Sequence, residues 1–154
     1  MATLRALGVP ARDAADLPRL LDHRRRELAE RVLEPVLVAW REGDGGVGPV
    51  EGDLRLRLPE RLRDAPLGVR VGLEGGGERS WKVAPSSLET VEETEVDGRS
   101  FRTVRTPLPD LPAGYHDLEV EARGGRWDAL LMVAPLRAAD WRAVGDRPAW
   151  GVFA

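Results

Sequence analysis

Alternation of apolar and polar side chains, which begins near Pro35, constrains the fold of this chain more than any other feature. In the stretch GDLRLRL, Leu54, Leu56 and Leu58 share one face of an extended backbone, and the intervening arginines share the other. The stretch LGVRVGL repeats the pattern. A period of two is that of a β-strand with one packed face and one hydrated face. The alternation therefore predicts sheets that each bury one side.

Further stretches of the same kind extend this prediction. PVLVAW and RSWKVAP are expected as strands, and two hairpins are expected around Asp97-Gly98 and around Gly124-Gly125. An Asp-Gly dipeptide supplies the positive φ angles of a tight turn. Seven or eight strands separated by Gly and Pro turns predict a mainly β fold, an antiparallel, immunoglobulin-like β-sandwich.

A different period precedes the strands. Residues 13–33 place leucines and a valine near a 3.6-residue stripe, which indicates an amphipathic helix. Asp13 or Asp16 can cap its start, and Pro35 is expected to end it. The sequence thus predicts three parts: a helical segment at 1–33, a β-sandwich domain at 34–136 and a linker at 137–154.

Composition excludes several classes of function. The chain of 154 residues has no cysteine, so it can form neither disulfides nor thiolate metal sites, and it has no cysteine nucleophile. A net charge of −3 supplies no basic field for nucleic acid. The longest apolar runs are too short to cross a bilayer. We expect a cytoplasmic protein that has neither nucleic acid nor membrane as a partner.

The stretch LPAGYHDLEVEA holds one of the two histidines of the chain. Its alternation points His116 inward at the start of a strand, whereas Tyr115 leans outward or caps the edge. We interpret the pair as a structural corner at which a ring bonds to nearby backbone. Catalysis by His116 would need a nucleophile or an acid as partner, and the sequence assigns none.

No cluster of side chains in the sequence matches a known chemical motif. The acidic run at Glu89, Glu92, Glu93 and Glu95 lacks the alternation and the glycine of a calcium loop, so we read it as a hydrated hairpin rim. The stretch EGGGE lacks the lysine and hydroxyl of a phosphate loop. The sequence predicts no catalytic, cofactor-binding or metal-ligating residue, and no cofactor.

Two of the five tryptophans are candidates for sugar stacking. Trp81 and Trp127 lie in predicted strands, and flat indoles can stack on the C–H faces of sugars. Tryptophan is also a large core residue, which is the competing interpretation for both. Both faces of the strand around Trp127 are apolar beyond residue 128, so we expect both faces to be buried there.

Both ends of the chain resemble a known family. ALGVPARDAADLPRLLDHRRRELAERVLEPVLVAWREG is similar to the segment in which long bacterial 4-α-glucanotransferases (amylomaltases) pass from an N-terminal helical region into a β-sandwich. LPAGYHDLEV, then LLMVAP and WGVFA, resemble the end of that sandwich and the approach to the catalytic barrel. The resemblance implies an enzyme that cleaves an α-1,4 bond of a maltooligosaccharide and passes the glycosyl piece to another glucan. It also implies a carboxylate nucleophile and a carboxylic acid/base on a (β/α)₈ barrel.

None of the catalytic residues of that family has a matching position in this chain, so we expect the chain alone to be inactive. The resemblance makes the catalytic barrel the expected partner, and Trp141, Trp150 and Phe153 are predicted to contact it. A structural domain that packs on the barrel is the favoured role, because the strands carry few free aromatic residues. The alternatives are a module that binds α-glucan chains, with a maltooligosaccharide as partner, and a stand-alone interaction domain.

Overall fold

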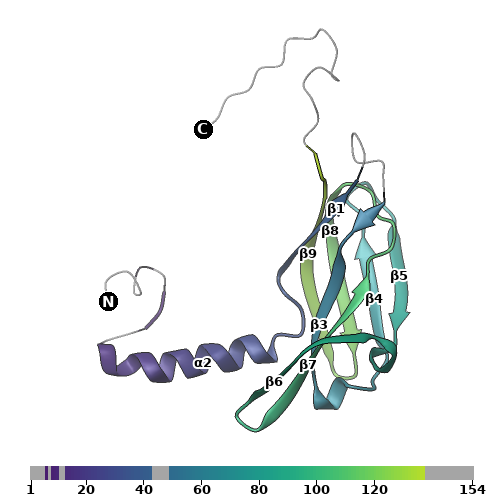
Figure 1. Cartoon of the computed structure of the whole chain (residues 1–154). Coiled ribbons are helices and arrows are strands. Elements are labelled where there is room, and N and C mark those ends of the chain that lie inside the picture. Colours follow the sequence, from purple (N-terminus) through teal and green to yellow (C-terminus); the bar gives the residue numbers. More distant parts are fainter. Residues whose placement is uncertain (1–5, 7, 11–12, 43–48, 138–154) are drawn as a thin grey trace.

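Two packed sheets and one helix make up the structure, a computed structural model that describes residues 6, 8–10, 13–42 and 49–137 (Figure 1). The larger sheet contains, in spatial order, β2 (Val50–Glu51), β1 (Val36–Arg41), β9 (Gly125–Pro135), β8 (Gly114–Ala122), β4 (Leu67–Gly72) and β5 (Glu78–Val83). The smaller sheet contains β3 (Asp53–Pro59), β7 (Arg99–Pro107) and β6 (Glu89–Val96). The predicted fold class, a mainly β sandwich with a short N-terminal helix, is confirmed.

Side chains from the facing surfaces of the two sheets form the core. Leu54, Leu56 and Leu58 of β3 are at most 1% exposed, and the predicted inner residues of β4 and β8 are equally buried. Arg55, between these leucines, is exposed. Because successive side chains of a strand point to opposite sides, the alternation in the sequence correctly assigned the packed side of β3, β4 and β8.

One strand pair departs from the antiparallel arrangement that the sequence predicted. β1 runs parallel to β9, with Val36 opposite Leu130 and Arg41 opposite Pro135. The other strand pairs among the described residues are antiparallel. A parallel pair needs a long connection between its strands, and here most of the sandwich lies between β1 and β9.

The helix is shorter than predicted. A short 3₁₀ turn, η1 (Ala14–Asp16), leads into α2 (Leu17–Glu30), and the side chain of Asp13 accepts a hydrogen bond of 2.8 Å from the Ala15 amide. The chain is already extended at Arg31, four residues before Pro35. The cause is tertiary: Val32 is 2% exposed in the core, and its carbonyl accepts a hydrogen bond of 2.9 Å from the Arg57 amide.

Both hairpin turns contain residues with positive φ angles. Asp97 (φ 52°) and Gly98 (φ 72°) form the β6–β7 turn, as predicted. The β8–β9 turn is formed by Arg123 and Gly124, one residue earlier than predicted, and Gly125 is the first residue of β9. A Cβ atom on Gly125 would lie 2.5 Å from the indole of Trp127. Gly125 is therefore required by packing rather than by the turn.

This packing predicts that Gly125→Ala lowers the free energy of unfolding by about 1–3 kcal/mol, because the indole of Trp127 must shift to admit a methyl group. Gly68→Ala is the matched control in the same sheet, since a Cβ atom there meets nothing within 4 Å. Urea denaturation followed by circular dichroism measures both. Equal stability of the two variants would show that the indole does not pack over Gly125.

Candidate functional site

The two predicted sugar-stacking residues lie in one row across the inner face of the larger sheet. Trp127 of β9 is opposite Val120 of β8, Val120 is opposite Val69 of β4, and Val69 is opposite Trp81 of β5. Directly opposed residues point to the same side of a sheet, and the two valines are at most 1% exposed. Both indoles are therefore on the core side, one at each end of the row.

Both indoles are half-buried and pack against the core. A sugar platform needs an exposed ring face, so this packing argues against stacking, and the stacking role of Trp81 and Trp127 stays a prediction. The three residues predicted to contact a barrel, Trp141, Trp150 and Phe153, lie outside the described residues.

His116 joins two loops at one end of the sandwich. Its ring is 1% exposed, and Nε2 lies 2.8 Å from the carbonyl oxygen of Pro112. The Glu74 amide donates a hydrogen bond of 3.3 Å to Nδ1. Because the carbonyl can only accept and the amide can only donate, the ring must carry its proton on Nε2. Both ring nitrogens are thus engaged with backbone, which favours the structural interpretation over catalysis.

Glu74 completes this corner. Its carboxylate accepts a hydrogen bond of 3.0 Å from the Tyr115 amide, while the Tyr115 side chain is 59% exposed. A Cβ atom on Gly114, whose φ is 148°, would lie 2.5 Å from the same carboxylate. The sequence analysis did not single out Glu74, because a residue that bonds across a loop leaves no periodic signal.

A charged cluster covers part of the outer face of the larger sheet. Glu119 of β8 is 7% exposed, and Arg70 donates to both of its carboxylate oxygens, at 3.2 and 2.7 Å. Arg126 forms a second ion pair with Glu119 and contacts Asp128 at 3.2 Å. The hydrogen bond and the charge of Glu119 raise the pKa of the Arg70 guanidinium. These charges pair with one another, so the cluster stabilises the sheet rather than offering unpaired groups to a ligand.

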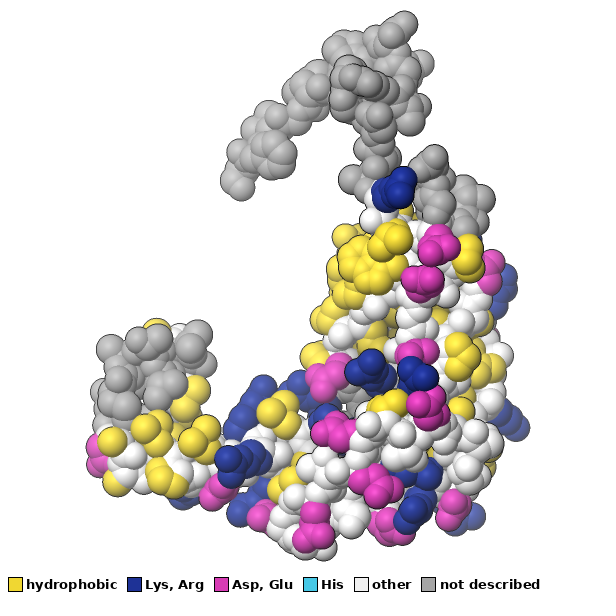
Figure 2. Space-filling view, viewed as in Figure 1, with side chains coloured by type: hydrophobic (Ala, Val, Ile, Leu, Met, Phe, Trp, Pro, Cys, Tyr) yellow, Lys and Arg dark blue, Asp and Glu magenta, His cyan; other side chains and the backbone are white. Residues whose placement is uncertain are grey.

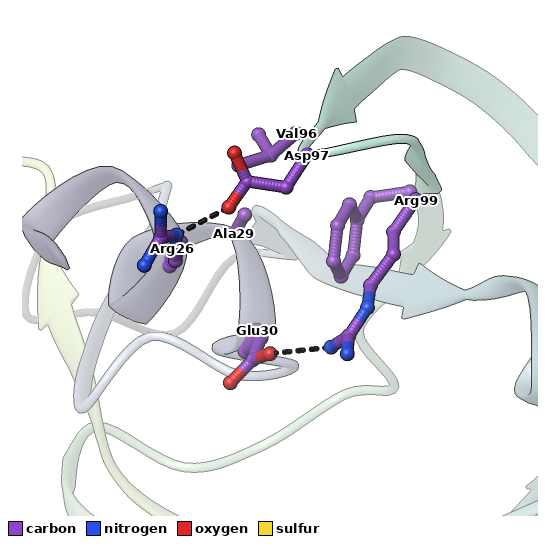
Figure 3. A pocket seen from close by; sticks show the side chains of 7 residues that line it. Arg26, Ala29, Glu30, Val96, Asp97 and Arg99 are labelled. Carbon is purple, nitrogen blue, oxygen red and sulfur yellow. Dashed lines mark hydrogen bonds and ion pairs between the residues drawn. The ribbon is translucent and has the colours of Figure 1, made fainter. Parts of the chain in front are cut away.

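A pocket lies where α2 meets the β6–β7 hairpin, lined by Arg26, Ala29, Glu30, Val96, Asp97, Arg99 and Phe101 (Figure 3). Arg26 is paired with Asp97, and Arg99 donates a hydrogen bond of 3.0 Å to Glu30. Each pair joins the helix to the hairpin, as the dashed lines in Figure 3 show. The pocket is thus a junction that holds the C-terminal half of α2 on the smaller sheet.

An apolar surface occupies the β1 side of the same outer face. We define the β1–β9 surface as the exposed apolar side chains of Val36, Val38 and Trp40 on β1, Leu130 on β9, Tyr115 on β8, and Leu136. Figure 2 shows hydrophobic side chains gathered on the side of the sandwich where β1 and β9 lie. The expectation that both faces of β9 are buried is wrong for Leu130, which is 36% exposed. No element among the described residues covers this side.

Sequence reasoning placed Trp40 at the end of a strand but assigned it no role. In PVLVAW the two faces of the strand are equally apolar, so the alternation could not indicate which face packs. In the structure Ala39 is buried and Trp40 is 45% exposed. A strand that is apolar on both sides could have indicated this surface, because such a strand is expected to be buried on its outer face as well as on its core face.

Among residues 6, 8–10, 13–42 and 49–137, no group of three or more His, Asp or Glu side chains is placed to hold a metal ion. The helices in this part of the chain are neither long nor apolar enough to cross a membrane.

Comparison with known proteins identifies the family. The sequence model of the MalQ N-terminal beta sandwich domain matches residues 32–135. The chain belongs to this family.

Relatives of this MalQ-type domain are much longer proteins. The 4-alpha-glucanotransferases of Mycobacterium tuberculosis (strain H37Rv) and Mycobacterium bovis are 29% identical to the chain over 157 residues, which cover 99% of the chain and 20% of each relative. Amylomaltase from Corynebacterium glutamicum superimposes with a TM-score of 0.58 at 25% identity, over 88% of this chain and 18% of that one. The chain therefore spans about a fifth of the length of its relatives.

The corner around His116 leads to a stability prediction for this MalQ-type sandwich. His116→Ala should lower the free energy of unfolding by about 1–3 kcal/mol, because the buried ring and its hydrogen bonds to two part-buried backbone groups are lost. His23→Ala, at an exposed position of α2, is the control and should change it by less than about 0.5 kcal/mol. If urea denaturation gives the same midpoint for both variants, the corner does not stabilise the fold.

Proposed function

We propose that the chain is the non-catalytic N-terminal domain of a 4-α-glucanotransferase that acts on maltooligosaccharides and other α-1,4-glucans. In this role it packs on the catalytic barrel of that enzyme and supports it. The catalytic carboxylates belong to the barrel. The working location of the enzyme is the cytoplasm.

The extent of the sequence match carries this proposal. Nearly the whole chain aligns with 4-alpha-glucanotransferases, yet the aligned part is only 20% of their length. A (β/α)₈ barrel takes about 250 residues, which cannot be built from a sandwich of this size. The side chains considered as possible sites support a non-catalytic role. His116 is hydrogen-bonded to backbone, and the charges at Glu119 and in the α2 pocket are paired.

A glycan-binding module is the second candidate. Its predicted platform, Trp81 and Trp127, is on the core side of the sheet, which weakens this candidate. The exposed aromatic pair Trp40 and Tyr115 keeps it open as a competing role for the outer face.

The proposal predicts that the 154-residue chain releases no glucose from maltotriose, because the pair of carboxylates that acts on the glycosidic bond belongs to the barrel. The natural protein that carries this domain should release glucose and form longer maltooligosaccharides from the same substrate. Thin-layer chromatography of the products measures both.

The control is the natural protein with a carboxylate-to-amide substitution in its barrel. Turnover by the purified 154-residue chain would overturn the non-catalytic role. A natural protein that is folded but inactive on maltotriose and on longer maltooligosaccharides would overturn the assignment of the enzyme.

A further inference from the structure

We propose that the β1–β9 surface is the face by which this domain docks on the catalytic part of the enzyme. The inference rests on the proposed function, which requires such a contact without saying where it lies. Of the residues that form the β1–β9 surface, only Tyr115 was given a role from the sequence, as part of the corner with His116.

The surface is continuous across three neighbouring strands. Val38 of β1 is opposite Met132 of β9, and Met132 is opposite Tyr115 of β8. Trp40, two residues along β1, is opposite Ala134. Since directly opposed residues of adjacent strands are neighbours on the same face of a sheet, these residues form one patch rather than scattered apolar positions. Contiguous exposed apolar patches with a polar rim mark interaction sites.

The outer face of the smaller sheet provides a contrast. Arg55 and Arg57 of β3 point outward there, next to Arg105 of β7, which is paired with Glu89 of β6. That face is hydrated and charged, as expected for a sheet that meets water. Of the two outer faces of the sandwich, the described residues therefore form an extended apolar surface only on the β1 side of the larger sheet.

The path of the chain indicates which partner covers the surface. The Leu136 amide donates a hydrogen bond of 2.8 Å to the Arg41 carbonyl, so the chain leaves β9 beside Trp40 and passes along the edge of the surface. Leu136 is itself 53% exposed and extends the patch. In the relatives, 80% of the length lies outside the aligned part. The residues predicted to contact the barrel, Trp141, Trp150 and Phe153, follow Leu136 in the sequence. A partner attached there is already close to the patch.

The composition of the patch favours a protein partner over a sugar. Val36, Val38 and Leu130 offer branched aliphatic groups, which suit the apolar core of a protein interface. Sugar platforms instead rely on flat rings with hydrogen-bonding groups beside them. The paired charges of Arg70, Glu119 and Arg126 border the patch and supply the polar rim of such an interface.

Val38→Glu in the natural protein tests this docking surface. Val38 is 48% exposed, so the glutamate should leave the melting temperature of the 154-residue chain unchanged. In the natural protein the same change buries a charge in the interface, and protease cleavage between residues 137 and 150 should become about tenfold faster, because cleavage follows the population of the opened state. Val91→Glu, at the 39% exposed valine of β6, is the matched control and should leave cleavage unchanged.

The outcomes separate this inference from the proposed function. Equal cleavage rates for Val38→Glu and the parent in an active natural protein would overturn the docking surface and leave the proposed function intact. A natural protein with no glucanotransferase activity would overturn the proposed function itself. Saturable binding of maltoheptaose to the 154-residue chain, abolished by both Trp40→Ala and Val38→Glu, would assign the surface to glucan instead and overturn docking.

Discussion

The parallel pairing of β1 with β9 is the contact on which the arrangement of the larger sheet depends. It joins the first long strand of the sandwich to the last, and hydrogen bonds continue it at both ends, from the Leu130 amide to the Pro35 carbonyl and from the Leu136 amide to the Arg41 carbonyl. Because the strands run in the same direction, the chain enters the sandwich at one end and leaves at the other. Figure 1 shows α2 at the entry and the last residues of β9 at the opposite end.

The strand β1 also gives the larger sheet its apolar outer face. β1 contributes Ala39 to the core on one side and Val36, Val38 and Trp40 to the surface on the other. Strands that are apolar on both sides are typical of sheets covered on both faces. Among the described residues, only the inner face of β1 is packed against another element. We propose that the catalytic part of the enzyme packs against its outer face.

The sequence predicted much of the fold where one face of a strand is polar. The arginines of β3 and the acidic residues of β8 made the inner face unambiguous, and the Asp97-Gly98 turn was located correctly. The parallel pair could not be predicted, because a period of two says nothing about which strand lies alongside. The end of α2 was misplaced because burial of Val32 and Leu33, rather than Pro35, ends the helix. Trp40 was assigned no role because the two sides of β1 are equally apolar.

Hydroxyl-radical footprinting of Trp40 tests the central claim most directly. In the 154-residue chain Trp40 and Tyr115 should oxidise readily, since their side chains are 45% and 59% exposed. In the full-length enzyme that the proposed function implies, the account predicts that both are protected, whereas Lys82, exposed at the far edge of the sheet, reacts equally in both proteins. Equal oxidation of Trp40 in the two proteins would contradict the claim that this face meets the catalytic part.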